Sequence, residues 1–198
     1  MPTTVYLMRH GEVTNDGEKR YNGHIDIDIT QKGVEQMHRL AGLLEGKGIV
    51  AVYSSDLIRS RKGAEIISRR VGIASTPLRE LRERSVGAWE GLTADDIKTR
   101  FPGQYAAWRE DLLNYRPPGG ECLADVSARI LPVFKRLVGS HPDQEIAMLL
   151  HGGVNRVILA DALGMDLMNL FRIDQAFGAL NIIDYHDGGM AVVKLLNG

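Results

Sequence analysis

Short apolar runs alternate with longer amphipathic segments along most of this 198-residue chain. The runs at 5–8, 50–53 and 147–150 lack the polar alternation of half-exposed strands and predict buried parallel strands. Helical spacing of apolar residues predicts four helices. They cover residues 30–44, with Thr30 as N-cap, 56–71, 126–137 and 154–163. Two further runs, 180–185 and 190–196, flank Asp187-Gly188-Gly189 and predict a hairpin at the sheet edge.

Strands that alternate with helices predict an α/β fold, a three-layer α/β/α sandwich with a mostly parallel sheet and an antiparallel edge strand. The length suits one domain over residues 1–198. The stretch 84–121 departs from this alternation, because it holds both tryptophans, two short helical pieces (94–100 and 104–113) and Pro117-Pro118-Gly119-Gly120. We expect it to be an insertion that covers the strand ends and closes a site there.

Composition narrows the choice of partners and compartment. A formal net charge of −1 argues against nonspecific nucleic-acid binding, which needs a basic surplus. No apolar run is long enough to span a membrane. The single cysteine, Cys122, excludes an internal disulfide framework and suits a reducing, cytoplasmic location. We therefore expect a cytoplasmic protein without nucleic-acid or membrane partners; the sequence leaves open whether it is a homodimer.

Two histidines carry most of the chemical information. His10 and His151 each follow an apolar run, and each is followed by glycine. In open α/β sheets, ligands bind at the carboxyl ends of the strands. A neutral imidazole can attack as a nucleophile or donate a hydrogen bond, so two at neighbouring strand ends could divide these roles. Glycine after each histidine would let the backbone come close to the ligand. The alternative for Arg9-His10-Gly11 alone is a surface loop, and the alternative for His151 alone is a structural, hydrogen-bonded histidine.

Arginines near these histidines indicate a phosphate ligand. Arg9 precedes His10, and Arg59 falls in the first turn of a predicted helix, where free backbone N–H groups favour anions. A guanidinium matches the geometry of phosphate oxygens. Arg61 is interpreted as a solvated helix residue. Glu83 has basic neighbours. It is either part of a surface charge cluster or, if it lies beside a bound phosphate, a proton donor.

The order of these clusters along nearly the whole chain resembles the histidine phosphatase superfamily, the group named after phosphoglycerate mutase. The matching motifs are Arg9-His10-Gly11-Glu12, Ser55-Asp56-Leu57-x-Arg59, Leu81-Arg82-Glu83 with Gly87-x-Trp89-Glu90-Gly91, Pro118-Gly119-Gly120-Glu121, and His151-Gly152-Gly153.

The resemblance implies a phosphomonoesterase that acts through a covalent phosphohistidine. His10 would attack phosphorus, while Arg9, Arg59 and His151 hold the nonbridging oxygens. Glu83 would protonate the leaving oxygen and then accept a proton from water. Two guanidiniums and an imidazolium would supply positive charge, so no metal or other cofactor is expected. The partner is then a small phosphorylated substrate.

Nearby carboxylates and amides leave some assignments open. Glu12 and Glu90 are alternatives to Glu83 as the acid.

Where many family members have asparagine, this chain has Asp16, preceded by Asn15, so either Asn15 substitutes or Asp16 turns outward. Asn22 stands where a phosphate-contacting glutamine is common. We expect Asn15, Asn22, Gly23 and Gly152 to bind substrate.

Several functions remain as alternatives. The chain ends soon after its last predicted strand, which favours a phosphatase over a cofactor-dependent phosphoglycerate mutase. Residues 171–175 (Phe-Arg-Ile-Asp-Gln) further resemble the α-ribazole phosphatases of cobalamin biosynthesis, so α-ribazole 5′-phosphate is one expected substrate. A noncatalytic phospholigand-binding module is another alternative. A metalloenzyme would use His10, His151, Asp26 and Asp28, although their spacing is not that of a metal site.

Overall fold

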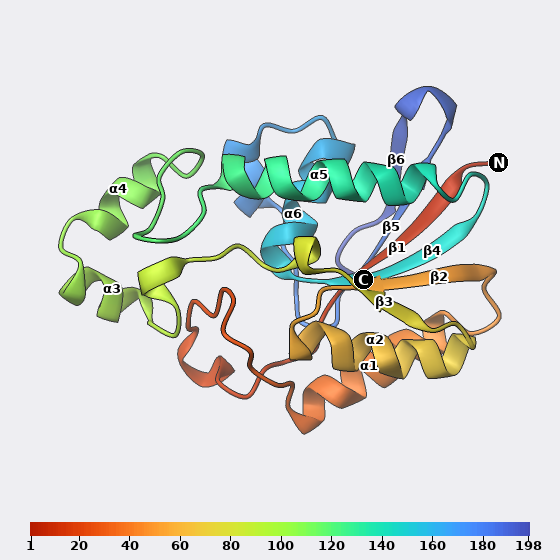
Figure 1. The fold of residues 1–198 in the computed structure, drawn as a ribbon, viewed down its shortest axis with the longest axis horizontal. Coiled ribbons are helices and arrows are strands. Elements are labelled where there is room, and N and C mark those ends of the chain that lie inside the picture. Colours follow the sequence, from red (N-terminus) through yellow and green to blue (C-terminus); the bar gives the residue numbers. More distant parts are fainter.

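Six strands form a mixed sheet in the order β3-β2-β4-β1-β5-β6 (Figure 1). The structure, a computed structural model, describes the backbone of residues 1–198 and every side chain except that of Asp16. β1, β4, β2 and β3 run parallel, whereas β5 is antiparallel to both β1 and β6. The strands are β1 (Thr3–Arg9), β2 (Ile49–Ser54), β3 (Ser75–Pro77), β4 (Glu145–Leu150), β5 (Leu180–Tyr185) and β6 (Ala191–Leu195). The predicted α/β class with a mostly parallel sheet is confirmed; the antiparallel strand is β5, which lies between β1 and the edge strand β6.

Helices cover both faces of the sheet. Figure 1 shows α1 and α2 on one face and α5 and α6 on the other. The helices are α1 (Gln31–Leu43), α2 (Ile58–Val71), α3 (Ala94–Arg100), α4 (Gln104–Glu110), α5 (Leu123–Gly139) and α6 (Gly152–Ala162). Single turns of 3₁₀ helix are η1 (Asp16–Glu18), η2 (Arg79–Leu81), η3 (Gly87–Trp89) and η5 (Asp187–Gly189), with the longer η4 at Leu167–Arg172. None of the helices in the described chain combines the length and apolar character needed to cross a bilayer.

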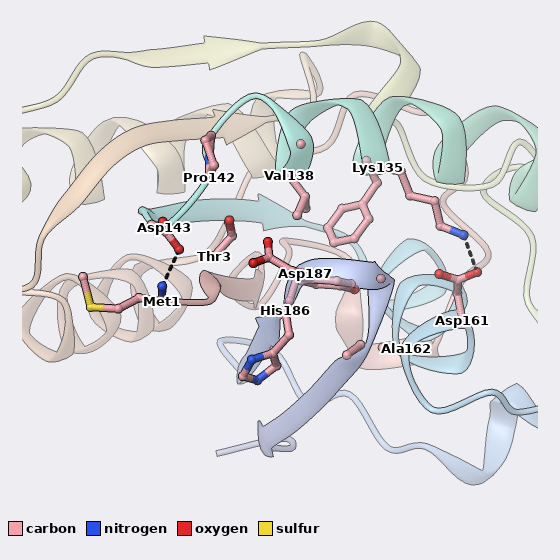
Figure 2. Close-up of a pocket in the computed structure, with 15 residues that line it drawn as sticks. Met1, Thr3, Lys135, Val138, Pro142, Asp143, Asp161, Ala162, His186 and Asp187 are labelled. Carbon is pink, nitrogen blue, oxygen red and sulfur yellow. Dashed lines mark hydrogen bonds and ion pairs between the residues drawn. The ribbon is translucent and has the colours of Figure 1, made fainter.

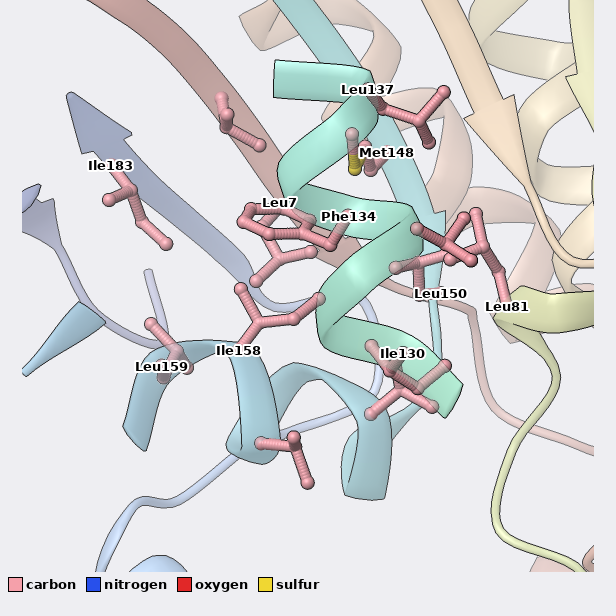
Figure 3. Close-up of a cluster of buried hydrophobic side chains, with 14 of the residues drawn as sticks. Leu7, Leu81, Ile130, Phe134, Leu137, Met148, Leu150, Ile158, Leu159 and Ile183 are labelled. Carbon is pink, nitrogen blue, oxygen red and sulfur yellow. The ribbon is translucent and has the colours of Figure 1, made fainter. Parts of the chain in front are cut away.

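The sheet is buried on both sides because its central strands carry uninterrupted apolar runs, residues 5–8 in β1 and 146–150 in β4. In β1, Val5 and Leu7 pack in the core under α5 and α6, while Tyr6 and Met8 pack in the core under α1 and α2. Figure 3 shows the first of these cores, with Phe134 of α5 close to Leu7. Side chains alternate across a strand, so a strand that supplies both cores must be apolar without interruption.

Helix boundaries differ from the prediction where side chains find tertiary partners. Thr30 caps α1 as predicted, since its Oγ1 accepts a hydrogen bond from the backbone N–H of Gly33 (3.0 Å). α2 begins at Ile58 rather than at 56, because the Asp56 carboxylate accepts two hydrogen bonds from Arg82 (2.6 Å each) instead of capping the helix. α6 begins at Gly152, two residues earlier than predicted. β3 was not predicted because three residues are too few to show a period.

The segment 84–121 has an apolar cluster of its own. Its buried members are Val86, Trp89, Ile97 and Trp108. Figure 1 shows α3 and α4 beyond the end of the sheet where β1 finishes. The Glu121 carboxylate holds the base of this segment, because it accepts hydrogen bonds from Arg129 of α5 and from the backbone N–H of Ser85 (2.7 and 2.8 Å).

Candidate active site

Three neighbouring parallel strands end in polar residues that meet at one edge of the sheet. Ser55 follows β2, His151 follows β4 and His10 follows β1, and the sheet order places β4 between the other two. The backbone N–H of His10 donates to the carbonyl of Leu150 (3.1 Å), which continues the β1–β4 pairing. The rings of His10 and His151 lie 5.2 Å apart between centroids. The topology therefore brings together two histidines that are far apart in the sequence.

His10 is held as a neutral ring with a defined tautomer. Its Nδ1 lies 2.8 Å from the carbonyl oxygen of Gly11, and because a carbonyl can only accept, Nδ1 carries the proton. The lone pair is then on Nε2. Burial, together with the charges of Arg9 and Arg59, lowers the pKa of His10 well below its usual value. His10 thus has the electronic state that a nucleophile needs at neutral pH.

His151 has the opposite arrangement. Its Nε2 lies 2.7 Å from Oγ of Ser55, which itself accepts a hydrogen bond from the backbone N–H of Leu57 (3.3 Å). The Ser55 hydroxyl can donate its proton to Nε2, and in that arrangement the ring proton of His151 lies on Nδ1. Nδ1 is buried and has no hydrogen-bond partner within the described part of the chain. A buried donor of this kind suggests a ligand that completes the bond.

The sequence analysis expected an imidazolium among the phosphate-binding groups, and the structure corrects this expectation for His151. Burial and the charges of Arg59 and His10 lower the pKa of His151 well below its usual value. The ring is therefore neutral in this structure and offers an N–H donor instead of a full positive charge.

Two guanidiniums at the site are oriented by hydrogen bonds to backbone carbonyls. Arg59 is 2% exposed and donates from Nη1 to Ile25 and from Nη2 to Gly23, at 2.7 Å each. Arg9 donates to the carbonyl of Gln175, and its guanidinium carbon lies 3.9 Å from the centroid of the Phe177 ring. Both arginines line one cavity with His10.

Glu83 also lines this cavity. Its Oε2 accepts a hydrogen bond from the backbone N–H of Gly153 (3.0 Å), at the first turn of α6, and its Oε1 accepts from that of Arg84 (2.8 Å). These bonds fix the carboxylate at the same helix end that begins with His151. The backbone carbonyl of Glu83 accepts a further hydrogen bond from Nε2 of His24 (2.8 Å). The sequence analysis did not single out His24, and no motif signal marked it.

The alternative carboxylates are engaged outside the cavity. Glu12 binds Lys32 (2.7 Å) and Thr30 (3.1 Å), and Glu90 accepts a hydrogen bond from the backbone N–H of His24 (3.0 Å). Neither carboxylate lines the cavity that holds His10. The geometry thus favours Glu83 over both as the acid.

Gly11 serves a protein contact, which corrects the expectation that this glycine admits the ligand. A Cβ on Gly11 would lie 2.4 Å from the backbone oxygen of Gly33, so Gly11 allows its loop to pack against α1. A Cβ on Gly153 would lie 2.4 Å from Oε1 of Glu83. Gly153 therefore makes room for the carboxylate.

The residues expected to bind substrate are distributed unevenly. Asn22 and Gly23 line the cavity, whereas Asn15 and Gly152 do not. Asn15 instead exchanges two amide hydrogen bonds with Asn22 (2.7 and 3.0 Å) and so orients it. The side chain of Asp16 lies outside the described residues.

The cavity has a volume of about 830 Å³ and is strongly cationic. Two carboxylates, Glu83 and Asp174, face a larger set of cations. These cations are Arg9, Lys19, Arg20, Arg59, Arg84, Arg109 and Arg156. Six aromatic side chains complete much of the wall: Tyr21, Trp89, Tyr105, Trp108, Phe171 and Phe177. The sequence analysis missed Arg84 and Arg156, although Arg156 lies one helical turn after Gly152 and so on the same face of α6.

A second hollow, of about 520 Å³, lies near the amino-terminal end of β1 (Figure 2). Its two cations are paired, since the amino group of Met1 binds Asp143 (2.6 Å) and Lys135 binds Asp161 (2.9 Å). This hollow therefore lacks the surplus of cations that the strand-end cavity offers to an anion.

The aspartates of the metalloenzyme alternative are also engaged elsewhere. Asp26 accepts a hydrogen bond from the backbone N–H of Ile58 (2.6 Å), and Asp28 pairs with Lys62. Neither lines the cavity with His10. The structure does not assemble the ligand set that this alternative requires.

Comparison with known proteins places this site in a family. The chain is 32% identical over 171 residues to glucosyl-3-phosphoglycerate phosphatase of Mycobacterium tuberculosis, covering 82% of this chain and 76% of that one. It is 31% identical over 195 residues to adenosylcobalamin/alpha-ribazole phosphatase of Salmonella typhimurium, covering 98% and 95%. The native structure of a mycobacterial glucosyl-3-phosphoglycerate phosphatase superposes with a TM-score of 0.90 at 27% identity, covering 100% of both chains. The sequence profile of the histidine phosphatase superfamily (branch 1) matches residues 5–198, and the chain belongs to this superfamily.

Proposed function

We propose that this protein hydrolyses phosphomonoesters of small metabolites through a phosphohistidine on His10. The observation that carries the proposal is the state of His10, a buried neutral imidazole whose Nδ1 faces the Gly11 carbonyl and whose pKa is lowered by burial and by two arginines. The same two cations that keep His10 neutral would attract the phosphoryl group.

In the first step, Nε2 of His10 attacks phosphorus and the bond from phosphorus to the ester oxygen breaks. Arg9, Arg59 and the Nδ1–H of His151 stabilise the charge on the nonbridging oxygens. Glu83, in its protonated form, transfers a proton to the leaving alcohol. In the second step, Glu83 takes a proton from water, the water oxygen attacks phosphorus, and the bond to His10 breaks to release phosphate.

Segment 84–121 supplies much of the cavity wall, so we propose that it covers the bound substrate and selects its alcohol group. Trp89, Tyr105 and Trp108 of this segment face the cavity together with Arg84 and Arg109. A cytoplasmic location remains part of the proposal, on the strength of the single, buried and unpaired Cys122.

The substrate is a matter for experiment, because the names of the relatives point to different alcohols. The aromatic wall would suit the planar base of α-ribazole 5′-phosphate, while the cations would suit a phosphorylated glycerate such as that of the mycobacterial relative. A phosphoglycerate mutase would instead return the phosphoryl group to its substrate. Release of inorganic phosphate from a panel with α-ribazole 5′-phosphate and 3-phosphoglycerate distinguishes these activities.

The decisive test is to trap the intermediate. Wild-type protein mixed with a labelled phosphomonoester and quenched within milliseconds should hold acid-labile, base-stable phosphate. His10→Ala should hold none and should lose at least about 10³-fold in turnover, the scale observed when a nucleophile is removed. Near-normal turnover by His10→Ala would refute the proposal.

A further inference from the structure

His24 lies in the loop that holds the guanidinium of Arg59. The two residues that flank it, Gly23 and Ile25, accept hydrogen bonds through their carbonyls from Nη2 and Nη1 of Arg59, at 2.7 Å each. Gly23 and Arg59 both line the cavity, whereas His24 does not. His24 can therefore affect the reaction only through the residues that it contacts.

The ring of His24 reaches the segment that carries the proposed acid. Its Nε2 lies 2.8 Å from the backbone carbonyl oxygen of Glu83, 59 residues further along the chain. Because a carbonyl can only accept, Nε2 carries a proton and donates it. This bond holds the backbone from which the Glu83 side chain projects, while the N–H groups of Gly153 and Arg84 hold its carboxylate (3.0 and 2.8 Å).

The backbone of His24 is bound to the same segment. Its N–H donates to Oε1 of Glu90 (3.0 Å), and this oxygen also accepts from Oγ of Ser85 (3.2 Å), two residues after Glu83. Gly23 lets the loop approach this closely, because its φ is +48° and a Cβ there would lie 2.6 Å from Oε1 of Glu90. The loop and the chain around Glu83 therefore pack as one unit.

A second donor to the Glu83 carbonyl has a different role. Nη2 of Arg129 also donates to this oxygen, but at the longer distance of 3.3 Å. Its Nη1 makes shorter bonds, of 2.7 and 2.9 Å, to carbonyls of the chain before Glu83. Arg129 thus fixes onto α5 the chain that leads to the acid, whereas His24 joins the acid to the loop that holds Arg59.

We infer that His24 is a positioning residue for the proposed reaction, one whose ring N–H sets Glu83 at the leaving oxygen of a phosphoryl group held by Arg59. This inference rests on the proposed phosphatase function. A general acid must lie within about 2.6–3.2 Å of the atom that it protonates, and misplacement by about 1 Å can cost roughly 10²-fold in rate. Without the His24 bond, Arg59 keeps both of its carbonyls but Glu83 is no longer fixed relative to them. Proton transfer should therefore fail while phosphate binding is kept.

His24→Phe tests the inference, because phenylalanine keeps a ring of similar size and removes the N–H. Presteady-state phosphorylation rates are compared for three esters whose alcohols are increasingly basic: p-nitrophenyl phosphate, phenyl phosphate and glycerol 3-phosphate. We expect a loss of less than about twofold for the first ester, a larger loss for the second and about 10- to 100-fold for the third. The Ki of inorganic phosphate should stay within about twofold of the wild-type value.

Rescue and a double-mutant cycle separate positioning from a merely structural role. His24→Gln should recover most of the rate with glycerol 3-phosphate, because its amide nitrogen is as many bonds from Cα as Nε2 of histidine. In a Glu83→Gln background, His24→Phe should cause no further loss, since both changes remove the same proton transfer. His24→Asn, whose amide nitrogen is one bond closer to Cα, should behave as His24→Phe does, and replaces it if the apolar ring prevents folding.

His141→Phe is the matched control, because Nε2 of His141 shares a bond of the same length, 2.8 Å, with the Tyr53 hydroxyl, and neither residue lines the cavity. It should leave all three rates within about twofold of the wild type. Equal losses of His24→Phe for the three esters, or additive losses with Glu83→Gln, would overturn the inference and keep the phosphatase. A wild type that does not turn over p-nitrophenyl phosphate would refute the proposed function, and the inference with it.

Discussion

The rings of His10 and His151 meet edge to face, with centroids 5.2 Å apart and planes inclined by 64°. Each ring is tied through a different nitrogen, His10 through Nδ1 to the Gly11 carbonyl and His151 through Nε2 to the Ser55 hydroxyl. His10 is left with a lone pair on Nε2. When the Ser55 hydroxyl donates to Nε2 of His151, that ring is left with an N–H at Nδ1. The pair therefore offers a nucleophile and a hydrogen-bond donor to one ligand, without a positive charge on either ring.

Ser55→Ala should lower kcat about tenfold, because His151 loses the partner that keeps its proton on Nδ1, and an unmade buried hydrogen bond costs roughly 1–3 kcal/mol. Nitrogen-15 NMR of labelled histidine should show His151 protonated at Nδ1 in the wild type and a mixture of tautomers in the variant. Ser140→Ala is the control, since the Ser140 hydroxyl bonds to the Leu137 carbonyl at the far end of α5. An unchanged His151 spectrum in Ser55→Ala would contradict the assignment.

Arg59→Lys should reduce kcat/KM by roughly 10²-fold, the scale observed on removal of one transition-state donor. The guanidinium uses one N–H of each terminal nitrogen to hold Gly23 and Ile25 and keeps others for phosphate, whereas an ammonium cannot fill both roles. Competitive inhibition by vanadate, which adopts the five-coordinate geometry of the transition state, should weaken in the same variant. Arg61→Lys on the same helix is the control. Wild-type kcat/KM in Arg59→Lys would remove Arg59 from the site.

Glu83→Gln should slow the phosphorylation step strongly for an alkyl phosphate, by about 10²- to 10⁴-fold, because the leaving alkoxide needs a proton. The loss should be much smaller for p-nitrophenyl phosphate, whose leaving group is stable as an anion. Presteady-state phosphorylation rates for the two substrates make the comparison, with Glu12→Gln as the control. Equal losses for both substrates would assign the acid role to another group.

The free energy of unfolding should fall as the pH drops below about 6.5. Burial lowers the folded-state pKa of both His10 and His151, so the unfolded chain takes up protons first. Stability is therefore full above pH 6.5 and is lost by up to about 1.4 kcal/mol per pH unit for each histidine below it. Urea unfolding between pH 8 and 5 in phosphate-free buffer measures the slope.

His151→Asn should make this slope shallower, while His38→Asn, at an exposed position on α1, should leave it as in the wild type. A wild-type slope in His151→Asn would show that His151 is protonated in the folded protein.

Local sequence determined the main elements and the edge of the sheet at which the proposed site residues gather. The apolar runs became β1, β2 and β4, and the periodic segments became α1, α2, α5 and α6, because their spacing leaves one way to bury the apolar side chains. The motifs around His10, Arg59, Glu83 and His151 were visible in the sequence, since each motif spans only a few consecutive residues. Their position at strand ends followed from the same apolar runs.

Tertiary structure alone decided how these motifs meet. The strand order places Ser55 and His10 on either side of His151, and no local pattern encodes the order in which separated strands pair. The hydrogen bond between His151 and Ser55 and the hydrogen bond from Gly153 to Glu83 each join distant segments of the chain. Burial and neighbouring charge set the state of each group, and both depend on the folded surroundings more than on the residue itself.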